Sequence, residues 1–150
     1  MRIPFVGWFL DKFERKEQMK KLPGKGALSL FFGVLLTIKL FPENIAYASI
    51  MILAIGDPVS HFVGKIFGRI KTPWNRIKMI EGNLAGAVVS GIAASALVNP
   101  LFAFIASFSA LLVETIEIKM NEKIIDDNII LPLTAGTAML LLETYASAFI

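Results

Sequence analysis

The sequence predicts an all-α protein, a polytopic membrane helical bundle of about five transmembrane helices preceded by an interfacial N-terminal amphipathic helix. Hydrophobic residues make up 55% of the 150 residues, and the mean hydropathy is +0.67. This apolar share exceeds that of an ordinary soluble domain. At about 20 residues for each crossing plus connections, the chain has room for roughly five spans in a single domain, 1–150.

Turn signals and polar stretches divide the chain into successive elements. Segment 1–22 mixes aromatic and basic residues, which is typical of a helix lying in the membrane interface, although a disordered basic tail is the alternative. The transmembrane bundle then occupies 23–150. The turn signals are PEN at 42–44 and NP at 99–100, and polar stretches cover 69–83 and 114–128. The five apolar segments predicted as spans are 26–41, 45–67, 84–98, 101–113 and 129–150.

The distribution of Lys and Arg predicts the orientation in the membrane. Seven basic residues precede the first span, five follow the second and two follow the fourth, and of all 15 only Lys39 lies near the opposite turn. Because Lys and Arg accumulate in cytoplasmic loops, we expect the N-terminus and both long loops to face the cytoplasm. The acidic residues of these loops lie on the same side of the membrane.

Composition excludes several kinds of site. The chain has no cysteine, so zinc-thiolate sites, disulfides and thiol nucleophiles are excluded, and its single histidine excludes a multi-histidine metal site. The apolar start IPFVGWFL is interrupted at Asp11, and we expect it to be retained rather than cleaved as a signal peptide.

The stretch GDPVSHFVGKIFGR, residues 56–69, concentrates polar residues in an apolar segment. Gly-Asp-Pro can end one helix and start another, so we expect the second span to be broken near Asp57, with Asp57 as a helix cap or a functional carboxylate. Because the chain has no second histidine, His61 is interpreted as a polar lining residue rather than a metal ligand or general base. Small residues recur every four positions here and again in the third span, so we expect these two helices to pack together. The two small-residue series are Gly56, Ser60, Gly64, Gly68 and Gly82, Gly86, Ser90, Ala94.

Four motifs in this order resemble the CTP-dependent polyprenol and diacylglycerol kinases, which include dolichol kinase and phytol kinase and are distantly related to the phosphatidate cytidylyltransferases. The motifs are GDPVSHFVGKIFGR (56–69), KMIEGNLAG (78–86), LLVETIE (111–117) and DDNIILPL (126–133). Ser60 and Asn83 depart from the commoner alanine and serine, and members of the family usually have additional helices before the first span seen here. The resemblance implies transfer of the γ-phosphate of CTP to a lipid alcohol, with Mg²⁺, at the cytoplasmic membrane face.

Phosphoryl transfer needs cations that neutralise phosphate charge and carboxylates that hold a metal or accept a proton. We assign Asp57 and Asp127 as metal-side carboxylates, with Asp126 or Glu114 beside them as a possible base. Residues expected to bind the nucleotide are Lys65, Arg69, Lys78, Glu81, Gly82, Asn83, Gly86 and Asn128.

Simpler roles remain open for several of these residues. Asp126, Asp127 and Asn128 can instead cap the last helix, and Lys78 with Glu81 can form a surface ion pair. For the recurring glycines and serines, helix packing is the better explanation, but it does not explain Asp57.

Two other functions compete with the kinase. A cytidylyltransferase would make a CDP-lipid from the same nucleotide, but DDNIILP resembles the kinases. A small transporter is disfavoured because polar residues gather at one membrane face and no internal repeat is visible. We expect CTP, a lipid alcohol and membrane lipids as partners, no nucleic acid, and a homo-oligomer as a further option.

Overall fold

The computed structural model describes residues 25–72, 78–116, 119–120, 123–124 and 126–148. The interfacial helix predicted for 1–22 lies outside these residues. The described part is helical, with α3 (Lys25–Leu40), α4 (Glu43–Phe67), α5 (Ile80–Ala94), α6 (Pro100–Glu114) and α7 (Asp127–Ala148). Two short strands, β1 (Lys119–Met120) and β2 (Lys123–Ile124), pair antiparallel between α6 and α7. Each of the five predicted apolar segments therefore corresponds to one helix, and the prediction of a helical fold is confirmed.

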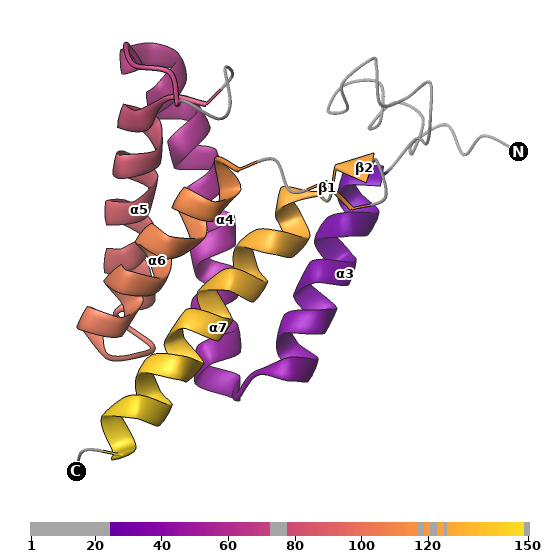
Figure 1. The fold of residues 1–150 in the computed structure, drawn as a ribbon, viewed down its shortest axis with the longest axis vertical. Coiled ribbons are helices and arrows are strands. Elements are labelled where there is room, and N and C mark those ends of the chain that lie inside the picture. Colours follow the sequence, from indigo (N-terminus) through magenta and orange to yellow (C-terminus); the bar gives the residue numbers. More distant parts are fainter. Residues whose placement is uncertain (1–24, 73–77, 117–118, 121–122, 125, 149–150) are drawn as a thin grey trace, which may run out of the picture.

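Successive helices run in alternating directions along the long axis of the molecule (Figure 1). The α3–α4 and α5–α6 turns lie at one end, and the start of α5, the end of α6 and the start of α7 lie towards the other. Asn99 begins α6 by accepting a hydrogen bond from the N–H of Leu101, with Pro100 at the first helical position. Among the described residues, α4 and α7 are long and apolar enough to cross a membrane, whereas α5 and α6 are shorter apolar helices.

Helix α4 is unbroken, so the predicted break near Asp57 is wrong. Pro58 lies inside the helix and deprives the carbonyl of Ala54 of its usual N–H partner. The helix continues because both sides of Pro58 pack closely on α5, with Gly56 and Ser60 buried in the contact. Asp57 consequently lies inside a continuous helix and does not act as a helix cap.

The packing of α4 against α5 confirms the contact predicted from their small residues. A Cβ atom added at Gly82 would overlap the carbonyl oxygen of Ser60, and one at Gly86 would lie 2.6 Å from the carbonyl oxygen of Gly56. These glycines thus allow the two backbones to approach more closely than any side chain would permit.

Polar contacts fix α6 against α5 in the middle of the bundle. Ser107 donates a hydrogen bond to the carbonyl of Ala87 at 2.5 Å, and the hydroxyls of Ser90 and Ser107 lie 2.9 Å apart. All three residues are buried. The hydrophobic core around them includes Ile52 of α4 and Leu111 of α6.

Candidate active site

A buried lysine joins the ends of three helices. Lys78 lies just before α5, and its ammonium pairs with the carboxylate of Glu114, the last residue of α6. The same ammonium donates to the Glu114 carbonyl oxygen at 3.2 Å and to Oδ2 of Asp127, the first residue of α7, at 3.1 Å. Lys78 is 8% exposed and Glu114 2% exposed. Buried charges of this kind must be paired, so the three residues hold one another in place.

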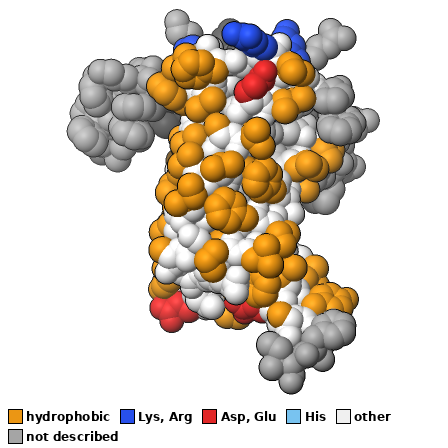
Figure 2. Space-filling model, turned by 90° about the vertical axis from the view of Figure 1, so that its left-hand side faces the viewer, with side chains coloured by type: hydrophobic (Ala, Val, Ile, Leu, Met, Phe, Trp, Pro, Cys, Tyr) orange, Lys and Arg blue, Asp and Glu red, His pale blue; other side chains and the backbone are white. Residues whose placement is uncertain are grey.

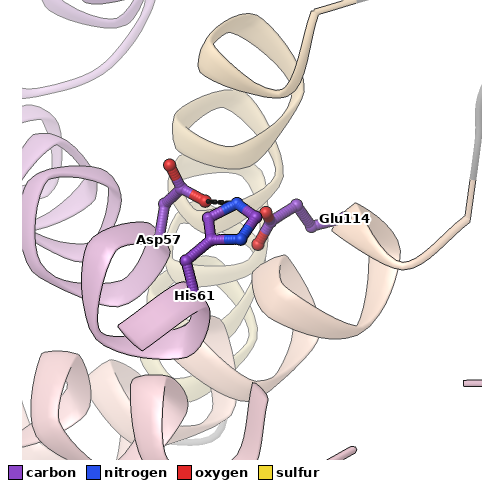
Figure 3. Close-up of side chains that lie close together, drawn as sticks. All are labelled: Asp57, His61 and Glu114. Carbon is purple, nitrogen blue, oxygen red and sulfur yellow. Dashed lines mark ion pairs between the residues drawn. The ribbon is translucent and has the colours of Figure 1, made fainter. Parts of the chain in front are cut away.

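Asp57 and His61 of α4 lie close to Glu114 of α6 (Figure 3). His61 Nε2 lies 3.1 Å from Oδ1 of Asp57, one helical turn earlier. One potential ligand atom from each of the three residues lies within 4.8 Å of the others. Oδ1 of Asp57 and Oε2 of Glu114 are buried without a hydrogen-bond partner among the described residues. Carboxylates, an imidazole and an ammonium therefore converge on a small region.

A polar pocket of about 320 Å³ opens beside this cluster. His61, Lys65 and Lys78 line it together with Asn83. Lys65 offers positive charge to this pocket, whereas the charge of Lys78 is already matched by Glu114 and Asp127. The volume of the pocket lies at the lower end of the range for small-molecule sites.

An apolar pocket of about 380 Å³ lies between α5 and α6. Its lining includes Leu84, Ala87, Phe108 and Leu112, and Asn83 lines both this pocket and the polar one. The Asn83 amide is held by a hydrogen bond to the carbonyl of Leu111 at 3.0 Å. A polar and an apolar pocket thus meet at one residue.

The structure brings together several predicted site residues from distant parts of the sequence. Asp57, Glu114, Asp127 and Lys78 form one connected group of side chains, and Lys65 and Asn83 line the adjoining pocket. Asp57 was expected to meet Asp127, but among the described residues its neighbours in the potential metal-ligand group are His61 and Glu114.

Glu81 has a local role. Its carboxylate accepts hydrogen bonds from the N–H groups of Arg69 at 3.1 Å and Ile70 at 3.1 Å, which hold the loop after α4 against the start of α5. Its own backbone N–H, followed by these two, holds the pKa of Glu81 below its ordinary value. The surface ion pair considered for Lys78 and Glu81 is therefore wrong, because Lys78 is buried against Glu114 and Asp127.

Of the three residues considered as caps of the last helix, two stabilise the start of α7. Oδ1 of Asp126 accepts hydrogen bonds from the backbone N–H of Asn128 at 3.2 Å and from its side-chain amide at 2.8 Å. The Asn128 amide also lies 3.5 Å from the carbonyl of Gly26. Asp126 and Asn128 thus stabilise the helix start, while Asp127 points to Lys78.

The remaining predicted residues lie outside the cluster. Gly82 and Gly86 face α4 and serve helix packing, and the exposed Arg69 follows α4. His61 was read from the sequence only as a lining residue, although its spacing of four from Asp57 already placed both on one helix face.

Comparison with known proteins adds one distant relative. No family model matches the chain, and no solved structure matches it. The chain is 29% identical over 131 residues to an uncharacterised protein of Methanocaldococcus jannaschii, a match that covers 87% of this chain and 63% of the relative. The chain therefore spans less than two thirds of that relative's length. Since the relative's name states no activity, the chemistry of the site itself is the guide to function.

Proposed function

We propose that the protein is an integral membrane lipid kinase that transfers the γ-phosphate of CTP to a lipid alcohol at the cytoplasmic membrane face. The observation that supports this most strongly is the meeting of the polar and apolar pockets at Asn83. A lipid alcohol has one polar end on a long apolar chain, so two such pockets side by side match both parts of it. CTP as the donor rests on the resemblance of the four sequence motifs.

Membrane embedding of all five described helices is part of this proposal. Hydrophobic side chains cover the face between the charged ends of the molecule (Figure 2). Large apolar side chains are exposed on every helix, for example Phe31, Phe62, Leu84, Leu112 and Leu141. Such a surface is unfavourable in water and favourable in lipid. The bias of Lys and Arg supports a cytoplasmic position for the end of the bundle that carries the site.

Positive charge at the polar pocket supports the handling of a triphosphate. Lys65 is exposed and can pair with phosphate oxygens, whereas Lys78 is already paired with Glu114 and Asp127 and fixes their positions. In phosphoryl transfer, catalysis is mainly positioning and charge stabilisation. Lys65 therefore binds the nucleotide and Lys78 positions the carboxylates.

The carboxylates fit the divalent cation that the resemblance implies. Oε2 of Glu114 is a buried acceptor without a hydrogen bond among the described residues, and buried Oδ1 of Asp57 has His61 Nε2 beside it at 3.1 Å; such carboxylate oxygens are the kind a hard cation binds. Asp57 and Glu114 would hold the ion, which when bound neutralises charge on the phosphate oxygens. Asp127, whose side chain is 45% exposed, stays available to accept the proton of the lipid hydroxyl.

The test is to give the purified full-length chain in lipid vesicles CTP labelled at the α or the γ phosphate, with polyprenol, phytol and diacylglycerol as acceptors. We expect γ label in the lipid fraction. Alpha label appearing with phosphatidate would instead establish a cytidylyltransferase, and transfer of neither label would overturn both enzyme proposals.

Two variants of carboxylates in α4 test whether Asp57 takes part in the transfer. Asp57→Asn should reduce transfer at least about a hundredfold, as expected for loss of a charge that stabilises the transition state. Glu43→Gln changes an exposed carboxylate at the opposite end of the same helix and should retain full transfer. Equal activity of the two variants would remove Asp57 from the mechanism.

A further inference from the structure

The Asp57–His61–Glu114 group contains more acceptors than donors. Asp57 Oδ1 and Glu114 Oε2 are buried and accept no hydrogen bond from the described residues. The imidazole Nε2 lies 3.1 Å from Asp57 Oδ1, and all three potential ligand atoms fall within 4.8 Å of one another. Carboxylate oxygens that face each other in a buried site need a proton or a metal cation between them.

The net charge of the connected group of side chains also favours a bound cation. Asp57, Glu114 and Asp127 carry three negative charges, and Lys78 supplies one positive charge. In the form that would bind a metal, with the three carboxylates ionised and the imidazole neutral, the net charge is −2, which one divalent cation balances.

The contacts of Lys78 do not occupy the oxygen of Glu114 that would bind the cation. Its ammonium pairs with Oε1 of Glu114, so the free Oε2 can bind a metal without breaking this contact. The Glu114 carbonyl and Asp127 are additional partners that keep Lys78 in place.

We propose that Asp57, His61 and Glu114 form a preorganised site for a first-row transition-metal dication such as Mn²⁺, which binds there more tightly than Mg²⁺. Mg²⁺ is bound mainly by oxygen, whereas an imidazole ligand favours the first-row metals. Ligands on an octahedral ion at about 2.1 Å lie about 3 Å apart when adjacent and about 4.2 Å apart when opposite, so separations of up to 4.8 Å need to shorten by less than about 2 Å. The inference deepens the proposed function and rests on it for the use of the metal, but the binding needs no CTP.

The experiment is a titration of the full-length protein in detergent micelles with Mn²⁺ alone, above pH 7 and without nucleotide. Free and bound Mn²⁺ are separated by electron paramagnetic resonance, and nitrogen coupling to the bound ion is measured by electron spin echo modulation. Because the chain has a single histidine, an imidazole nitrogen signal from protein lacking a histidine tag identifies His61. We expect one bound Mn²⁺ with nitrogen coupling that excess Mg²⁺ displaces only weakly.

Variants complete the test. His61→Gln should abolish the nitrogen coupling and weaken Mn²⁺ binding by about tenfold or more, since even outer-shell partners of a metal contribute tenfold to a hundredfold. Asp57→Asn should weaken binding as well, and Glu43→Gln should leave it unchanged. Circular dichroism of each variant verifies that it is folded.

Three results would overturn the inference. They are the absence of Mn²⁺ binding without nucleotide, bound Mn²⁺ without nitrogen coupling, and Mg²⁺ binding as tightly as Mn²⁺. Each of these can occur while γ label from CTP still reaches the lipid, so a failure here is distinct from a failure of the kinase proposal.

Discussion

Replacing Lys78 by methionine should destabilise the protein strongly. Lys78 is 8% exposed and its partner Glu114 is 2% exposed, so the substitution leaves a carboxylate buried without its counter-charge. Breaking one side of a buried ion pair costs about 3–5 kcal/mol of the free energy of unfolding. The contact with Asp127 adds little to this, because that side chain is 45% exposed.

The free energy of unfolding can be measured by pulse proteolysis of the protein in detergent micelles across a urea series. Lys39→Met is the matched control, because Lys39 is exposed at the other end of the bundle and its replacement should change stability by no more than about 0.5 kcal/mol. The double variant Lys78→Met with Glu114→Gln should recover at least half of the loss, since no unpaired charge remains buried. Equal stability of the Lys78 and Lys39 variants, or a double variant that is merely additive, would refute the reasoning.

Three further predictions concern packing, the loop after α4 and the apolar pocket. Gly82→Ala should cost about 1–3 kcal/mol of unfolding free energy, because its Cβ meets backbone of α4, whereas Gly26→Ala meets nothing within 4 Å and should be neutral in the same proteolysis assay. Glu81→Gln should speed hydrogen exchange at the two backbone N–H groups that the Glu81 carboxylate accepts from. Because the pKa of Glu81 is lowered by folding, the protection in the unchanged protein should be complete at neutral pH and be lost as the pH falls below the ordinary value of 4.5 and through that lowered pKa, measured by mass spectrometry. Leu84→Trp, which enlarges an exposed side chain lining the apolar pocket, should raise the KM for the lipid at least about threefold and leave the KM for CTP unchanged in steady-state transfer assays, whereas equal changes in both would argue against a lipid site there.

Much of the fold follows from local patterns in the sequence. Apolar segments bounded by Pro, Asn and charged residues gave the five helices, and the four-residue spacing of Gly and Ser gave the contact between α4 and α5. The break at Asp57 was wrong, because Pro58 signals a break locally while the tertiary packing of Gly56 and Ser60 maintains the helix.

Several residues of the candidate site could be predicted from the sequence, but the contacts between them could not. Lys78 meets Glu114 across 36 residues and Asp127 across 49. No periodicity encodes such contacts, since they depend on how the ends of α5, α6 and α7 come together. Glu81, three residues from Lys78, instead binds backbone N–H groups of the preceding loop, which only the path of that loop determines.

The hydrogen bonds of Ser107 set the depth of Glu114. Ser107 is bonded to the Ala87 carbonyl in the middle of the bundle, and Glu114 lies seven residues later on the same helix, about 10 Å along its axis. A slide of α6 along α5 would break this bond and carry Glu114 away from Lys78 by the same distance. The position of Glu114 beside Lys78 therefore depends on a buried hydroxyl in the middle of the bundle, so a substitution of Ser107 should disturb the candidate site without changing any of its residues.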